Sequence, residues 1–473
     1  MLRAWLLVLL LPACAAPAVP APAPLAPLPS AQQLRWHALE AYAFVHFNMN
    51  TFTGREWGEG TEHPDLFQPD ALDCRQWARL CKAAGLRGII LTAKHHDGFC
   101  LWPSDLTEHD VAASSWRGGR GDVLAELSAA CRAEGLLFGV YLSPWDRNAP
   151  DYGDSPRYDA RYVAQLEEVL TRYGEVFEVW WDGACGEGPN GKRQVYDWER
   201  YRATVRRLQP EAVIFSDVGP DVRWVGNERG FAGETCWGML SPEGHEPGER
   251  APPLEELNQG REDGTHWIPG ECDVSIRPGW YYHAEQDEEV KSLEELLAIW
   301  HGSVGRGANL LLNLPVDRRG LVHEADAARL LELRAALDAL YAEDLAPRAR
   351  ATATNVRGDA RRFGAARVLD GDPATYWATD DGVTAAALEL VFPRPVRCDR
   401  VRLEEPLALG QRVRSFEVEA RVEGVWRTVA RATTIGARRI VVFEPVVAEA
   451  LRVRVTSARA AVAIGAVRVY CGG

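Results

Sequence analysis

The sequence has no excess of positive charge and, beyond its first residues, no long apolar run. Its 473 residues include 53 Lys and Arg against 67 Asp and Glu, a formal charge of −14. A protein that binds nucleic acid through phosphates normally has the opposite sign, so this class is excluded. No later segment reaches the 18 uninterrupted apolar residues of a spanning helix, so we expect the mature chain not to cross a membrane.

Motifs of several enzyme classes are also missing. The ten cysteines form no C-x-x-C pair and show no zinc spacing, which argues against a structural zinc site. No G-x-G-x-x-G follows the first predicted strand and no G-x-S-x-G occurs, so dinucleotide binding and serine hydrolysis have no support. An oxidising compartment would permit disulfides, and Cys398 and Cys471 bracket a segment that such a bond could close.

The first 30 residues predict an export signal and a tether rather than part of the fold. Arg3 precedes an apolar run and then small residues, a pattern typical of a signal peptide over residues 1–16. Residues 17–30 follow as a Pro/Ala-rich tether. We therefore expect an exported protein, periplasmic or extracellular.

Two processing routes stay open at the signal. Cleavage at the small residues would release a soluble protein. Leu11 to Cys14 also resembles a bacterial lipobox, which would leave a lipid on Cys14 as the one contact with a membrane. Pro12 does not suit a lipobox, so soluble export is preferred.

Residues 31–346 alternate short apolar runs with amphipathic stretches, the pattern of a (β/α)₈ barrel, with a doubly wound sheet as the alternative. Gly85, Gly135 and Gly174 each follow a predicted helix, where a left-handed cap is wanted. The stretch 230–265 has no clear periodicity and is expected to be a long loop. The expected strands are 42–47, 88–93, 137–142, 176–181, 212–216, 223–226, 268–272 and 309–314; the expected helices are 71–84, 122–134, 158–173, 196–208, 293–304 and 324–341.

Residues 347–473 predict an all-β sandwich. They contain short alternating runs separated by turn signals and no convincing helix. The charge also changes sign, because residues from 350 onward carry +6 and those before carry −20. The acidity of the chain therefore belongs to the barrel.

The predicted strand ends are rich in histidine, carboxylate and tryptophan, and the carboxyl ends of barrel strands are where chemistry gathers. Two carboxylates there suit a retaining glycosidase, with His bonding sugar hydroxyls and Trp stacking on the ring. Asp182 follows a buried strand, so we favour a catalytic role for it, although Asp-Gly is also a common turn. Glu228, taken alone, could be an exposed acid in a loop. The residues at these ends are His46, Lys94 to Asp97, Tyr141, Ser143, Trp145, Asp146, Trp181 to Gly183, Asp217, Asn227, Glu228, Glu271, Asp273 and Asn313.

A metal centre is the alternative chemistry at these ends. His46, His95, His96 and Asp182 could in principle hold zinc. Metal-dependent barrel hydrolases usually place H-x-H on the first strand, whereas His46 stands alone there. We expect no metal and no other cofactor.

The sequence has three segments, FVHF at 44–47, KHHDGF at 94–99 and WDG at 181–183, that resemble the signature of glycoside hydrolase family 29, the retaining α-L-fucosidases. Further segments resemble its subfamily selective for α-1,3/1,4-linked fucose. They are YLSPWD at 141–146, GACGEGPNG at 183–191, RWVGNE at 223–228 and SIRPGW at 275–280.

The resemblance implies hydrolysis of α-1,3/1,4-linked fucose on Lewis-type glycans, so the expected partner is a fucosylated oligosaccharide or glycoconjugate. It makes Asp182 the nucleophile and Glu228 the acid/base. Glu271 and Glu234 are fallbacks, because the acid/base position varies in the family. The residues that would bind fucose are His46, Glu56, Trp57, His95, His96, Tyr141, Trp145 and Trp280. A broad-specificity α-L-fucosidase and a non-catalytic fucose-binding protein remain as alternatives.

The C-terminal part has VLDGD at 368–372 and TYWA at 375–378, which resemble the discoidin-like (F5/8 type C) sandwich with a galactose-binding-like fold. Two interpretations stay open. The module could bind glycans, or it could support the barrel with Trp377 in its core.

Overall fold

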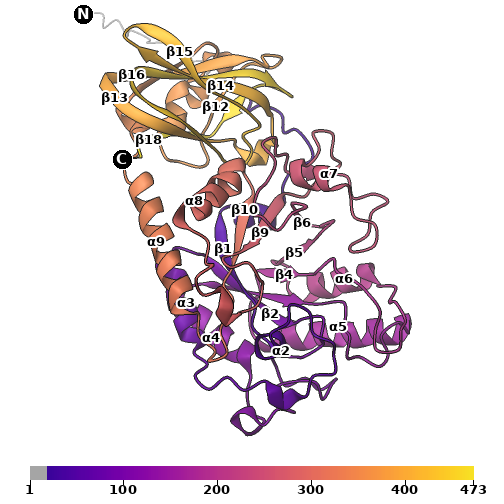
Figure 1. Cartoon of the computed structure of the whole chain (residues 1–473). Coiled ribbons are helices and arrows are strands. Elements are labelled where there is room, and N and C mark those ends of the chain that lie inside the picture. The colour runs from indigo at the N-terminus through magenta and orange to yellow at the C-terminus, as the bar shows by residue number, and fades with distance from the viewer. Residues whose placement is uncertain (1–18, 473) are drawn as a thin grey trace, which may run out of the picture.

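The computed structural model describes residues 19–472, in which a closed barrel is followed by an antiparallel sandwich (Figure 1). Every pairing in the barrel is parallel, in the order β1-β10-β9-β6-β5-β4-β3-β2. The predicted barrel is confirmed. Its strands are β1 (Ala41–Val45), β2 (Gly88–Lys94), β3 (Leu137–Leu142), β4 (Glu178–Trp180), β5 (Val213–Ser216), β6 (Val222–Trp224), β9 (Gly270–Ser275) and β10 (Asn309–Asn313).

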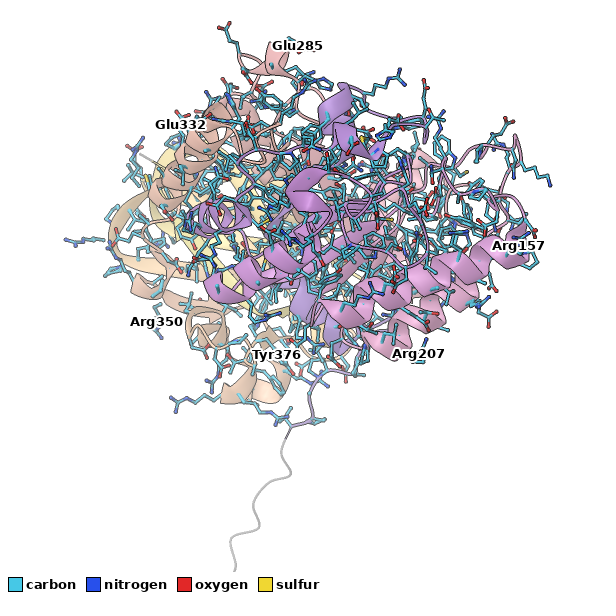
Figure 2. All side chains as sticks on the ribbon, turned by 90° about the horizontal axis from the view of Figure 1, so that it is seen from below. Arg157, Arg207, Glu285, Glu332, Arg350 and Tyr376 are labelled. Atoms are coloured by element: carbon cyan, nitrogen blue, oxygen red, sulfur yellow. The ribbon has the colours of Figure 1, made fainter. Side chains whose placement is uncertain are left out.

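The barrel strands are buried almost completely, because side chains fill the inside and helices cover the outside. The helices are α1 (Ala31–His37), α2 (Met49–Thr53), α3 (Cys74–Ala83), α4 (Val123–Glu134), α5 (Ser155–Arg172), α6 (Trp198–Leu208), α7 (Leu254–Gln259), α8 (Leu293–Gly302) and α9 (Glu324–Leu340). Charged side chains such as Arg157, Arg207 and Glu332 point outward from them (Figure 2).

Local sequence signals mark where several helices begin and end. The Asp122 side chain accepts a hydrogen bond from the backbone of Ala125 at the start of α4, and Gly135 ends that helix with a φ of 73°. Ser292 and Glu295 form a capping box on α8.

One crossover has no helix, because only residues 217–221 join β5 to β6. The 230–265 stretch is mostly loop, with short α7 and the two-residue strand β7 (Met239–Leu240), which pairs with β8 (His266–Trp267).

The sandwich is built on a six-stranded antiparallel sheet, with β12 and β17 paired separately. Trp377 is fully buried in its core, which supports the structural interpretation of that residue. Cys398 and Cys471 form no disulfide and, like the other described cysteines, are free thiols. The strands are β11 (Arg350–Ala353), β12 (Trp377–Ala378), β13 (Ala386–Glu404), β14 (Val413–Val422), β15 (Val425–Thr433), β16 (Arg439–Ala458), β17 (Ala463–Ile464) and β18 (Ala466–Tyr470).

The sandwich packs against the barrel where β1 and β10 begin. Arg438 of the sandwich is 2% exposed and donates to the carbonyl of His37 and, over 2.9 Å, to Oδ1 of Asn309. These two barrel residues precede β1 and open β10. Buried hydrogen-bonded charges tie the parts together, so the carboxyl ends of the strands face away from the sandwich (Figure 1).

The N-terminal segment lies along the sandwich rather than apart from it. Leu25 N–H donates to the carbonyl of Leu409 over 3.0 Å, and Arg357 donates to the carbonyl of Pro20 over 2.6 Å. Residues 19–30 of the predicted tether are therefore packed against the protein. The predicted signal and Cys14 lie outside the described residues, and among the described helices none is long and apolar enough to cross a membrane.

Candidate active site

A cavity of about 300 Å³ opens at the carboxyl ends of the barrel strands. This is where such barrels hold their chemistry. It contains both predicted catalytic carboxylates and six of the eight predicted sugar-binding residues. Its lining is Phe44, His46, Glu56, Trp57, His95, Tyr141, Trp180, Asp182, Gly183, Ala184, Phe215, Asp217, Trp224, Glu228, Asp273 and Trp280.

Asp182 lies two residues after the end of β4, and its carboxylate is held by two donors. Tyr141 Oη donates to Oδ2 over 3.0 Å, and the backbone N–H of Ala184 donates to Oδ1 over 2.7 Å. Its side chain stays 25% exposed toward the cavity. A carboxylate fixed in this way can meet a bound substrate in one orientation.

Glu228 follows β6, and its carboxyl group holds a proton more readily than an exposed glutamate. Burial raises the pKa of the Glu228 carboxyl, and the negative charge of Asp182 raises it further. Trp280 Nε1 donates to its Oε2 over 3.3 Å. A carboxyl group with a raised pKa keeps its proton closer to neutral pH, as a general acid requires.

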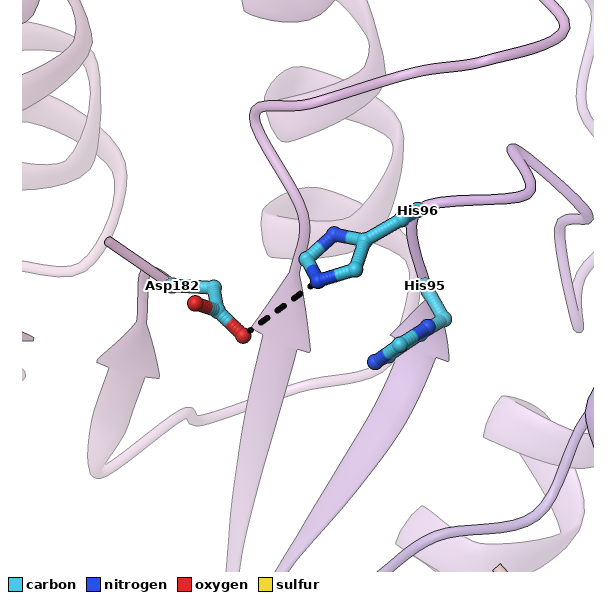
Figure 3. Close-up of side chains that lie close together, drawn as sticks. All are labelled: His95, His96 and Asp182. Carbon is cyan, nitrogen blue, oxygen red and sulfur yellow. Dashed lines mark ion pairs between the residues drawn. The ribbon is translucent and has the colours of Figure 1, made fainter. Parts of the chain in front are cut away.

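The ring of His96 points at Asp182, with Nε2 3.6 Å from Oδ2 (Figure 3). His96 Nδ1 lies 2.8 Å from Ser143 Oγ, whose own hydrogen goes to the carbonyl of Trp145. This network assigns the ring proton to Nδ1, so Nε2 carries a lone pair. That nitrogen is buried without a hydrogen-bond partner in the described structure.

His46 is assigned in the same way. Its Nδ1 lies 2.8 Å from Oδ1 of Asn313, whose amide nitrogen donates to Ser275 and Trp280. Oδ1 is thus the acceptor, and His46 Nε2 is left with a lone pair. Burial lowers the pKa of His46 to about 3 and that of His96 to about 4, so both rings are neutral at neutral pH.

His95 has the opposite tautomer. Its Nδ1 lies 3.3 Å from the amide nitrogen of Asn50, which also donates to the carbonyl of Glu56, so Nδ1 accepts and Nε2 carries the proton. Within the described residues, His95, His96 and Asp182 are the one group close enough to share a metal ion. A metal needs lone pairs from all three, whereas this network offers an N–H from His95. The set favours sugar hydroxyls over a cation.

The Glu56-Trp57 pair borders the cavity from the loop after α2. Glu56 accepts from the backbone of Trp280 over 2.9 Å and from His283 Nε2 over 2.8 Å, which fixes it beside the ring of Trp280. Trp57 is 53% exposed, an unusual state for so large an apolar side chain and one that suits stacking on a sugar.

Two predicted sugar-binding residues lie behind the lining. His96 and Trp145 both pack edge-on against Trp57, with ring centroids 5.3 and 5.4 Å from it. Trp145 Nε1 is engaged by the carbonyl of Glu187 over 3.1 Å. In this structure they pack against Trp57 rather than form the cavity surface.

The two fallback acids lie elsewhere. Glu271 is fully buried inside the barrel, where Tyr42 Oη and Trp180 Nε1 donate to it and Glu178 lies beside it. Glu234 is on the surface, 3.5 Å from Arg306. Neither lines the cavity, so the geometry favours Glu228.

Part of the cavity lining was not predicted from the sequence. Asp217 and Asp273 stood among the strand-end residues but received no role, and both are buried in the cavity wall. Trp224 Nε1 donates to Asp273 over 2.9 Å. The aromatic floor of Phe44, Trp180, Phe215 and Trp224 also went unrecognised. Its signal was present, because Phe44 lies two residues before His46 and so shares its inward face.

Comparison with known proteins shows the family to which the chain belongs. Residues 27–339 match the model of the α-L-fucosidase family, and residues 350–467 match the F5/8 type C domain. An α-L-fucosidase 1 of Arabidopsis thaliana is 42% identical over 434 residues, 91% of this chain and 85% of that protein.

Solved structures of fucosidases superpose on most of the chain. A family 29 glycoside hydrolase from a rumen bacterium is 41% identical, with a TM-score of 0.83, 96% of this chain and 78% of that one. A Ruminococcus gnavus family 29 fucosidase in complex with fucose is 32% identical, with a TM-score of 0.88, 96% of this chain and 97% of that one. The chain belongs to the α-L-fucosidase family, glycoside hydrolase family 29, and ends in an F5/8 type C domain.

Proposed function

We propose that this protein is a retaining exo-α-L-fucosidase that removes α-1,3/1,4-linked fucose from Lewis-type glycans. The observation that carries the proposal is one cavity in which two of the lining carboxyl groups, Asp182 and Glu228, have different surroundings. Asp182 is fixed by two donors, and Glu228 has a raised pKa. Double displacement needs such a nucleophile and such an acid.

In the first step, a carboxylate oxygen of Asp182 attacks C1 of fucose while the bond from C1 to the leaving oxygen breaks. Glu228 gives its proton to that oxygen, and the leaving sugar departs as an alcohol. The lone pair of His46 and the N–H of His95, both in the cavity lining, orient the ring hydroxyls. Because these rings are neutral, they act through hydrogen bonds and not through charge.

In the second step, water gives its proton to the Glu228 carboxylate, and its oxygen displaces Asp182 from C1. The charge of Asp182 raises the pKa of Glu228 in the free enzyme. That charge is absent while Asp182 is an ester. The pKa of Glu228 therefore falls in the step in which Glu228 acts as a base. The two residues thus change roles together.

The proposed linkage rests on the subfamily-like segments, and the exo mode on the size of the cavity, which suits one sugar ring. A relative's complex with fucose supports the class of substrate. The runner-up is a broad-specificity fucosidase.

Side-by-side rates test the proposal. We expect kcat/KM on a branched Lewis trisaccharide to exceed that on an aryl α-L-fucoside by about tenfold or more, because binding of the attached sugars contributes to the transition state. Proton NMR of the first product should show α-fucose. A linear α-1,2-fucosylated sugar is the control. Equal rates on all three would indicate the broad-specificity enzyme, β-fucose would exclude retention, and binding without turnover would indicate a lectin.

A further inference from the structure

A tight turn from the long loop after β6 lies against the backbone beside Asp182. Glu246 and Arg250 exchange two backbone hydrogen bonds, of 3.2 and 3.1 Å, which places Gly248 at the tip. We call residues 246–250 the Gly248 turn. It belongs to residues 230–265, for which the sequence shows no clear periodicity.

Gly248 fits this place because it has no side chain. Its φ is +80°, and a Cβ there would lie 2.6 Å from the carbonyl oxygen of Gly183 and 3.4 Å from Sγ of Cys185. Gly183 directly follows Asp182. The tip of the turn therefore touches the segment that carries the proposed nucleophile.

Asp217 joins the turn to the cavity. It follows β5, between the strands that end at Asp182 and Glu228, and is 8% exposed in the cavity wall. Its Oδ2 accepts the N–H of Gly248 over 3.0 Å and lies 2.7 Å from where a Cβ on Gly183 would stand. Two glycines thus pack on one carboxyl group.

We propose that Asp217 is a positioning residue that holds the Gly248 turn beside the nucleophile, and that this turn forms one wall of the subsite for the sugar that carries fucose. The inference rests on the proposed function and extends it to the choice of leaving sugar. It explains why an acid with no place in double displacement is buried at this point of the cavity.

The place of the turn suits a leaving sugar. Fucose occupies the cavity, and Glu228 must reach the leaving oxygen, so the attached sugar lies on the side of β5 and β6. There the turn presents the exposed polar side chains of Glu246, Glu249 and Arg250. Glu246 and Arg250 pair over 2.8 Å and can both hydrogen-bond hydroxyls at the rim.

Two glycine variants test the wall directly. Gly248→Ala should push the turn away and lower kcat/KM on a branched Lewis trisaccharide by about tenfold or more, chiefly through KM, with an aryl fucoside within about threefold. Gly244→Ala is the matched control, because its φ is +83° in the same loop and a Cβ there meets nothing within 4 Å. It should leave both rates within about threefold.

Two variants of Asp217 test whether this residue holds the Gly248 turn. Asp217→Ala should lower the preference for the branched sugar as Gly248→Ala does. Asp217→Asn should restore most of it, because the amide oxygen can still accept from Gly248. Equal losses on both substrates in Gly248→Ala, unchanged selectivity, or no rescue by asparagine would overturn the inference and leave the proposed function intact. No turnover of either substrate by the wild-type protein would overturn both.

Discussion

Replacement of Asp182 by alanine should lower kcat by roughly 10⁵-fold, because the fucosyl-enzyme ester can no longer form. The donors that hold the carboxylate, Tyr141 Oη and the N–H of Ala184, remain and cannot replace an attacking oxygen. Initial rates on an aryl α-L-fucoside give the result without dependence on the attached sugar.

The control for Asp182→Ala is a measurement of thermal stability. The side chain is partly exposed at the cavity, so its loss should leave the thermal midpoint within a few degrees. Added azide can enter the vacated space and attack C1 in one displacement, which gives the β-fucosyl azide. Near-normal turnover in a folded variant would remove Asp182 from the mechanism.

Replacement of Glu228 by alanine should lower kcat/KM on the branched glycan by about 10²–10⁴-fold, since the leaving sugar loses its proton donor. An aryl fucoside with a good leaving group needs little acid help, so it should still form the ester and then stall. Azide should release that ester as the α-fucosyl azide. The anomer of the azide product thus separates the role of Glu228 from that of Asp182.

The pH profile checks the same residue independently. Burial raises the pKa of Glu228 above its ordinary value, and the first step needs its protonated form. Activity should therefore decline as the pH rises through that pKa, and Glu228→Ala should lose this alkaline limb. Glu234→Ala, an exposed acid, is the matched control and should keep the wild-type profile. An azide product from a Glu234 variant but not from a Glu228 variant would reverse the assignment.

The barrel could be predicted from the sequence because its apolar runs are long enough to be buried on both faces. The exact ends of the strands could not be predicted, since they depend on how far neighbouring strands pair. The run 176–181 predicts a strand of six residues, whereas β4 covers Glu178–Trp180, which is as far as its neighbours pair with it. The 17–30 segment predicted a tether from its composition, yet contacts from Arg357 and Leu409 hold its described part in place.

The site was predictable where residue type and spacing are specific, as in the His95-His96 pair and Asp182. It was not predictable where only geometry separates two acids. Glu228 and Glu271 both stand near predicted strand ends, but Glu271 points into the barrel and Glu228 into the cavity. Asp217 accepts a hydrogen bond from Gly248, 31 residues later, and no pattern in the sequence indicates this contact.

The path of residues 19–30 along the sandwich determines how the enzyme can be attached to something else. The sandwich packs against the barrel where β1 and β10 begin (Figure 1). The cavity opens at the carboxyl ends of the strands. A resin, fusion partner or lipid joined ahead of Val19 would therefore sit behind the enzyme and leave the mouth of the cavity turned outward. Bulky glycans on a facing surface could then reach Asp182 without passing the point of attachment.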